Sequence, residues 1–216
     1  MKTDFQAGGL TILDEPLLAA PRVSVPDEFT TLDWYDGRMY CLPPSNQEQL
    51  PACAGFAADG YAEVDKWAET GIKEQYDGKA TYYRAKELEG NNKDGTTLTW
   101  AAKAAQDLGH IDADLTIRTI KTKREVQFAL HKHKAVIAGF MITAGWNDVS
   151  DDGWINENDI EAIGGHAVLL CWYNDDPNYP MGIGLQNSWD DWGYKGFGRM
   201  SWKAFHQQFL YAIVLE

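Results

Sequence analysis

The sequence predicts an α+β protein in which helices come first and most strands follow. Apolar residues recur at steps of three and four in the first half, which is typical of helices with one buried face. Beyond residue 134, short runs rich in β-branched and aromatic residues are typical of strands. A helical half followed by a strand-rich half indicates two lobes with a cleft between them. We expect an N-terminal extension at 1–24, a helical lobe at about 25–115 and a β lobe at about 116–216.

Three helices are expected, each with a recognisable boundary. The first begins at Pro51 or Ala52, because an N–H at the first helical position has no partner and proline is therefore tolerated there. The second covers 98–108 and is followed by a glycine. The third covers 123–133, where a threonine and a glutamate have the spacing of a capping box.

Five segments of the second half have the composition of strands. Each is a mostly apolar run with turn-forming residues nearby. They are 135–143, 166–173, 182–186, 197–202 and 211–215.

The composition limits the classes of function. The chain has 216 residues, 44% of them hydrophobic, and a formal net charge of −13. That charge argues against a nucleic-acid or anionic-membrane surface, and no run approaches the ~18 apolar residues of a membrane span. The N-terminus lacks the features of a signal peptide, and three scattered cysteines are too few for a disulfide framework. We expect a cytoplasmic protein whose oligomeric state the sequence leaves open.

Cys53 lies in the segment NQEQLPACAGFA, at the start of the first predicted helix. A thiol in the first helical turn lies at the positive end of the helix dipole, which favours the thiolate. A nearby imidazolium would favour it further and would create a nucleophile at neutral pH. Among five histidines, His166 stands out because GGHAVLL places it at the start of an apolar strand, where an imidazole is costly to bury. Asn187 ends another predicted strand beside Trp189.

Together these segments resemble the papain-like cysteine peptidases, in which a cysteine, a histidine and an asparagine follow in this order. NQEQLPACAGFA is similar to the family's segment with a glutamine six positions before the cysteine. GGHAVLLCWYN is similar to its histidine strand, and QNSWDDWGYKGFGRM to its Asn-Ser-Trp stretch. VPDEFTTLDW is similar to the start of mature enzymes, so the resemblance runs from about Val25 to the C-terminus. It implies a helical lobe and an antiparallel β-barrel-like lobe, with the active cleft between them.

The resemblance implies catalytic roles. Cys53 would be the nucleophile that forms a thioester, and His166 would exchange protons with it and with the leaving amine. Asn187 would orient the imidazole, and Trp189 would shield their hydrogen bond from water. Gln47 and the Cys53 N–H would donate hydrogen bonds to the oxyanion.

The resemblance also implies a substrate. We expect an endopeptidase that acts on a peptide or protein, without a metal or other cofactor. It would select mainly for an apolar side chain two residues before the cut. Gly165 and Ala167 would border the pocket for that side chain, and Gly95 would also contact the substrate.

The chain departs from the family pattern at several positions. Leu50 stands where the family has a disulfide-forming cysteine, and Ala54 where it has an indole. Family zymogens carry a long propeptide, which 24 residues cannot form. We therefore expect residues 1–24 to lie along the body and to cover part of the cleft.

Two other functions remain open from the sequence. The same cysteine–histidine pair would serve an amidase, an isopeptidase or a peptide ligase, because no motif decides whether water or an amine attacks a thioester. The second is a non-catalytic peptide-binding protein on a peptidase scaffold, although the intact set of four catalytic residues argues against it.

The remaining reactive side chains are given structural interpretations. Cys41 and Cys171 are expected to be packing residues. Glu63 is either a buried carboxylate or a surface residue. The acidic segment 148–159 matches a calcium-loop pattern except for Asp at its last position, so calcium binding stays an alternative to a solvated turn.

Overall fold

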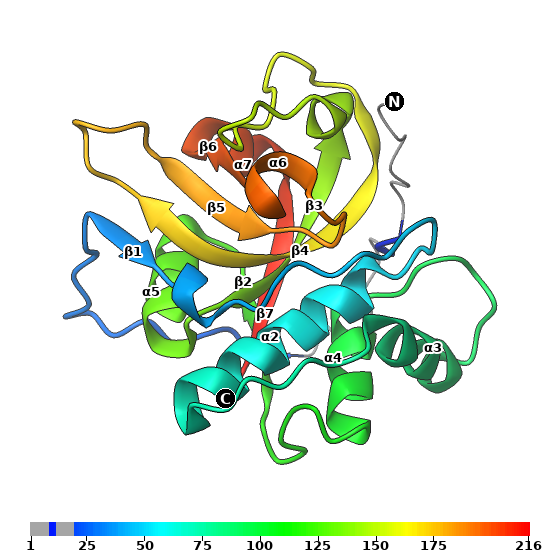
Figure 1. The fold of residues 1–216 in the computed structure, drawn as a ribbon. Helices are drawn as coiled ribbons and strands as arrows, with labels where there is room; N and C mark the ends of the chain where they lie inside the picture. Colours follow the sequence, from blue (N-terminus) through cyan, green and yellow to red (C-terminus); the bar gives the residue numbers. More distant parts are fainter. Residues whose placement is uncertain (1–8, 12–19) are drawn as a thin grey trace.

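The computed structural model describes residues 9–11 and 20–216. Figure 1 shows a group of helices packed against one side of a larger assembly of strands. Helices and antiparallel strands are combined as the sequence predicts, and three of the helices precede most of the strands. The α+β fold class is therefore confirmed.

The strands belong to one antiparallel sheet. Their bounds are β1 Trp34–Asp36, β2 Ile117–Ile120, β3 Val136–Thr143, β4 Ala162–Asn174, β5 Gly182–Gln186, β6 Phe197–Ser201 and β7 Phe209–Leu215. Within the described residues the order is β2-β7-β3-β4-β5-β6, and the short β1 pairs with β4 outside this path. The register of β3 against β4 places His166 opposite Phe140 and Ala167 opposite Gly139. The pairing of β4 therefore fixes the position of the candidate histidine.

The helical part contains α2 Cys53–Thr70, α3 Gly78–Glu89 and α4 Leu98–Asp107. α2 begins at Cys53, one residue after the later of its two predicted starts. α4 begins as predicted, and the side chain of its N-cap residue Thr97 accepts a hydrogen bond from the Trp100 N–H. The sequence analysis did not predict α3, whose start is capped by the Asp77 side chain.

The remaining helical segments connect or flank the strands. They are η1 Arg38–Tyr40, α5 Lys123–His133, η2 Ala144–Asn147, α6 Trp192–Lys195 and α7 Trp202–Gln208. The predicted capping box of α5 is present, since the side chains of Thr122 and Glu125 each accept from the backbone N–H of the other. α7 was not predicted, and its first residue was assigned to the preceding strand. The Ser201 hydroxyl caps this helix by accepting from the Ala204 N–H.

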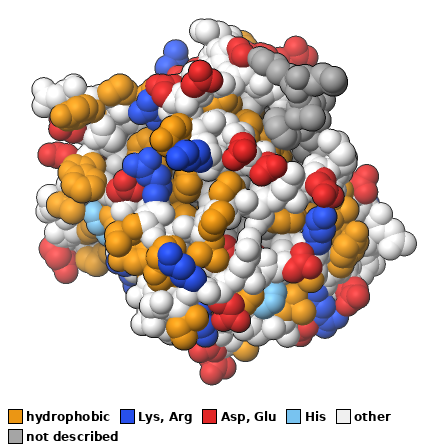
Figure 2. All heavy atoms as spheres, viewed as in Figure 1, with side chains coloured by type: hydrophobic (Ala, Val, Ile, Leu, Met, Phe, Trp, Pro, Cys, Tyr) orange, Lys and Arg blue, Asp and Glu red, His pale blue; other side chains and the backbone are white. Residues whose placement is uncertain are grey.

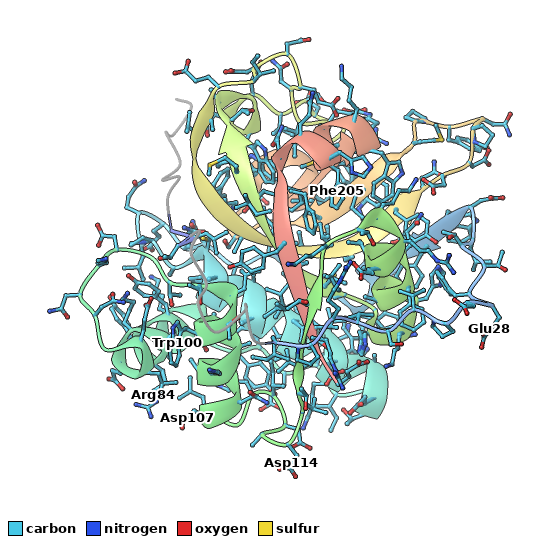
Figure 3. All side chains as sticks on the ribbon, turned by 180° about the vertical axis from the view of Figure 1, so that it is seen from behind. Glu28, Arg84, Trp100, Asp107, Asp114 and Phe205 are labelled. Atoms are coloured by element: carbon cyan, nitrogen blue, oxygen red, sulfur yellow. The ribbon has the colours of Figure 1, made fainter. Side chains whose placement is uncertain are left out.

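α2 joins the helices to the sheet. A Cβ added to Gly60 would lie 3.4 Å from Leu169 Cδ2, so helix and strand are in close contact. The Tyr61 hydroxyl donates to the Leu215 carbonyl at 3.1 Å. On the outer side of the helical part, Arg84 and Asp107 connect α3 to α4 through a 2.6 Å ion pair (Figure 3). The N-terminal end of α2 is thus buried where helices and sheet meet.

The surface carries charges of both signs. Figure 2 shows acidic side chains spread around one face and basic side chains near its centre, without a continuous basic area. This pattern agrees with the net charge of −13. Among the described residues, none of the helices combines the length and apolar character that a membrane span requires.

Candidate active site

Cys53 is the first residue of α2 and is completely buried. The chain turns tightly before it, with the Ala52 N–H donating to the Leu50 carbonyl at 2.8 Å. The backbone N–H groups of Ala167 and Ala54 lie near enough to the sulfur to lower the pKa of the thiol. Ala167 directly follows His166 in β4. The helix start therefore brings the thiol to the strand that carries the predicted imidazole.

His166 is fixed on several sides. Its Nε2 lies 2.8 Å from Asn187 Oδ1, so in the neutral ring Nε2 carries the proton and donates to the amide oxygen. The Trp189 ring lies 4.4 Å from the imidazole, centroid to centroid, and the Trp146 ring 5.9 Å. Nδ1 has no hydrogen-bond partner among the described residues. The ring is thus held with Nδ1 free to accept a proton.

Gln47 is also buried, and its amide has a fixed orientation. Oε1 accepts from the Ser188 hydroxyl at 2.7 Å, and Nε2 donates to the Leu50 carbonyl at 2.9 Å. The Gln47 N–H donates to the Ser188 carbonyl at 2.9 Å. Because an amide nitrogen carries two hydrogens, Nε2 keeps one for a substrate oxygen. Sequence analysis gave Ser188 no role, although it lies inside the quoted Asn-Ser-Trp stretch.

Burial favours the uncharged forms of the candidate nucleophile and the candidate base. Burial raises the pKa of the Cys53 thiol to about 12, although backbone N–H groups oppose the shift. Burial also lowers the pKa of His166 to about 4, against the contribution of Asn187. The sequence predicts a thiolate on the basis of the helix dipole. Here the cost of burying a charge exceeds that contribution, because a dipole effect is worth only about 1 kcal/mol.

The predicted cover over the cleft is present at residues 9–11. A Cβ on Gly9 would lie 2.9 Å from Cys53 Sγ and 2.8 Å from the Pro51 carbonyl carbon, so only glycine fits above the thiol. The Leu10 N–H donates to the Gly165 carbonyl at 3.3 Å. The neighbouring parts of the extension, 1–8 and 12–19, lie outside the described residues.

The backbone of Thr96, next to Gly95, also binds the segment 9–11. The Thr96 N–H donates to the Gly9 carbonyl at 3.1 Å, and the Thr11 N–H donates to the Thr96 carbonyl at 2.9 Å. These bonds form a parallel bridge. The predicted substrate residue Gly95 is buried and adjacent, but the pairing groups belong to Thr96.

Leu10 fills an apolar recess. Only 4% of the residue is exposed, and a Cβ added to Gly139 would lie 2.7 Å from its Cδ2 and 3.7 Å from a Leu98 methyl carbon. Of the predicted pocket residues, Gly165 binds the Leu10 backbone, whereas the Ala167 N–H lies near the sulfur and lowers the pKa of the thiol. Gly139 and Leu98 were not predicted, because their proximity depends on how β3 and α4 pack.

The other candidate groups have structural partners. Asp152 of the acidic segment forms a 2.7 Å ion pair with Arg199 and accepts from the Ser150 hydroxyl. Across residues 9–11 and 20–216, no three His, Cys, Asp or Glu side chains converge as metal ligands would. Glu63 is buried and accepts from the Tyr76 N–H at 3.0 Å, and burial raises its pKa to about 7.

No protein-family model and no curated protein matches this sequence. The structure, however, is similar to solved papain-like proteases. Xylellain, a cysteine protease from Xylella fastidiosa, matches 100% of this chain and 96% of its own, with 15% identity and a TM-score of 0.76. Procathepsin L 3 of the Tenebrio molitor larval midgut matches 99% of this chain and 76% of its own, with 15% identity and a TM-score of 0.73.

A third similar structure is procathepsin B from Trypanosoma congolense. It matches 96% of this chain and 85% of its own, with 11% identity and a TM-score of 0.71. Identities this low establish the fold and leave the activity to be argued from the site. The chain has the two-lobe papain-like fold that its motifs predict.

Proposed function

We propose that the protein is a cysteine endopeptidase that cleaves peptide bonds through a thioester on Cys53. The observation that carries the proposal is the arrangement of β4. His166 is oriented by Asn187, its Nδ1 has no partner among the described residues, and the N–H of the next residue lies near the sulfur. A nucleophile beside a base that a third group orients is the minimal machinery for acyl transfer.

The reaction would proceed in two stages. Cys53 Sγ gives its proton to His166 Nδ1 and attacks the peptide carbonyl carbon. The oxyanion accepts hydrogen bonds from the Cys53 N–H and Gln47 Nε2, each worth about 2.7–4 kcal/mol. The imidazolium returns the proton to the leaving amine, and the acyl group stays on sulfur. Water then gives a proton to Nδ1 and attacks the thioester, which releases the acid and the thiol.

The described form is a latent one. Gly9 occupies the space above the sulfur, and the adjoining segment uses backbone groups of Gly165 and Thr96 that an extended peptide would need. Activity therefore requires displacement or removal of the N-terminal segment. The Leu10 recess supports a preference for an apolar side chain near the cut.

The test compares the full chain, a chain beginning at Val25, and the same shortened chain with Cys53→Ala. A peptide library is incubated with each, and thermal melting checks that all three are folded. We expect cleavage by the shortened chain, loss of cleavage with Cys53→Ala, and weak or delayed cleavage by the full chain. A folded shortened chain whose Cys53 reacts with iodoacetamide but cleaves nothing would contradict the proposal.

An added amine nucleophile distinguishes hydrolysis from ligation. Release of a free carboxylate in the presence of the amine supports the peptidase. Dominant transfer of the acyl group to the amine would instead assign a ligase that uses the same thioester.

A further inference from the structure

Two cysteines outside the candidate site lie side by side. Cys41 follows η1, and Cys171 lies in β4. Gly37 connects them, because its N–H donates to the Cys171 carbonyl at 2.8 Å and its carbonyl accepts from the Cys41 thiol at 3.9 Å. The Cys41 thiol is also near enough to Cys171 to contribute to the raised pKa of that thiol. The sequence suggested two separate packing residues, and the fold brings them together.

The local backbone keeps this arrangement in place. β1 pairs with β4 through Asp36 and Trp172, directly before Gly37 (Figure 1). A Cβ on Gly37 would lie 2.5 Å from the Lys134 carbonyl oxygen and 2.9 Å from that of Cys171, so the close approach requires glycine. The Cys41 N–H then donates to the Arg38 carbonyl at 3.0 Å. The turn through η1 thus returns Cys41 to the strand.

The two thiols differ in accessibility. Cys41 is half-buried, whereas Cys171 is completely buried. Burial raises the pKa of Cys171 well above its ordinary value, so this thiol is a poor nucleophile toward reagents from solvent. A reagent would therefore meet Cys41 first, and Cys171 would react only with a group already attached to Cys41.

We infer that Cys41 and Cys171 are a redox-reactive pair that a low-molecular-weight disulfide oxidises to an intramolecular disulfide. The Cys41 thiolate attacks one sulfur of the reagent and releases the other half as a thiol, which takes up the Cys41 proton. Cys171 then attacks the Cys41 sulfur of the mixed disulfide and releases the second half as a thiol. Two protein S–H bonds are replaced by one S–S bond, and the reagent is reduced to two thiols.

The cross-link would join two segments that lead to the candidate site. The chain after Cys41 continues to Leu42, whose carbonyl accepts from Gln186 Nε2 at 2.6 Å, and then to Gln47. Cys171 lies in the strand that carries His166. Oxidation would tie these segments together and would stabilise the fold, because a disulfide that closes a long loop restricts the unfolded chain.

The experiment uses the full chain with oxidised glutathione as the probe. After incubation, free thiols are blocked with iodoacetamide, and peptides are mapped without reduction. We expect a Cys41–Cys171 cross-linked peptide, a rise in melting temperature of about 5–10 °C, and reversal of both by dithiothreitol. A stable glutathione adduct on Cys41 with Cys171 still free, or two unmodified thiols, would overturn the inference.

Matched variants separate this chemistry from that of Cys53. Cys171→Ser should stop at a single adduct on Cys41, and Cys41→Ser should leave Cys171 unmodified. Cys53→Ala should form the cross-link with the same rise in melting temperature. The outcome is therefore independent of whether the protein is a peptidase.

Discussion

The two walls of the candidate site are built in different ways. On the β wall, His166 is held by Asn187 at 2.8 Å and by the Trp189 ring at 4.4 Å, all within the sheet and its loops. On the helix wall, the Cys53 sulfur meets backbone N–H groups and is covered by Gly9 from the N-terminal extension. The imidazole is therefore oriented by packing within the sheet and its loops, whereas the thiol is covered by a segment that the proposed activation would displace.

The largest expected effect comes from removing a reacting group from either wall. In the shortened chain, Cys53→Ala, His166→Ala and the double variant should each lower kcat/KM by about 10⁴-fold or more, and the double variant should lose little beyond either single one. In the proposed mechanism the two groups act as a unit, so neither would contribute without the other. Cleavage assays with His206→Ala, an exposed histidine of α7, provide the control. Substantial activity in His166→Ala would show that the β wall does not supply the base.

The second effect concerns only the helix wall. Gly9→Leu should increase the alkylation rate of Cys53 in the full chain by about 100-fold near neutral pH. A side chain at position 9 would collide with the Pro51 carbonyl and the sulfur and displace the segment. Exposure would lower the thiol pKa from about 12 toward its ordinary value. Each decrease of the pKa by one gives about tenfold more thiolate at neutral pH.

Iodoacetamide labelling followed by peptide mapping measures that rate. Glu69→Leu is the matched control, because it introduces the same side chain at an exposed position near the other end of α2. An unchanged rate in Gly9→Leu would mean that the N-terminal segment does not control the thiol.

The third effect concerns the ionisation of a carboxyl group on the same helix as the thiol. Burial raises the pKa of Glu63 from 4.5 to about 7. Between these values the folded state binds more protons than the unfolded state, so stability falls as pH rises from about 4.5 to 7. Glu63→Gln keeps an acceptor for the Tyr76 N–H but cannot ionise. It therefore avoids the loss in the free energy of unfolding that ionising Glu63 causes, which is on the order of 2–3 kcal/mol above pH 7.

Thermal melting at pH 5 and pH 8 measures the Glu63 effect. Glu63→Gln should raise the melting temperature by several degrees at pH 8, on the order of 2–4 °C per kcal/mol, and by little at pH 5. Glu69→Gln, an exposed position on the same helix, should change neither value. An equal gain at both pH values would trace the effect to packing instead of ionisation.

Sequence predicted the β wall better than the helix wall for a physical reason. His166, Asn187 and Trp189 occur in compact motifs, and strand ends place such residues at one edge of a sheet. The cover over Cys53 and the bond from Ser188 to Gln47 join residues far apart in the chain, in the second case by 141 positions. Periodicity carries no information on such pairs.

Local patterns also failed where packing decides the outcome. Gly95 was predicted to contact the substrate, but the hydrogen bonds to the N-terminal segment are made by Thr96. α3 was not predicted because few of its residues are buried, and no apolar stripe marks it. The contact between Cys41 and Cys171 likewise depends on the pairing of β1 with β4.

The smallest expected effect tests the connection between the two walls. In the shortened chain, Ser188→Ala should lower kcat by about three- to tenfold and leave KM nearly unchanged, because it removes the 2.7 Å hydrogen bond that orients the Gln47 amide. A bond of this kind is worth about 1 kcal/mol, and a misaligned donor affects the oxyanion more than the bound substrate. Ser45→Ala is the control, since within the described part of the chain its hydroxyl makes only a long 3.4 Å contact with Gln75. If Ser188→Ala raised KM and left kcat intact, Gln47 would act in substrate binding, and the helix wall would contribute only the thiol and its backbone N–H to the chemistry.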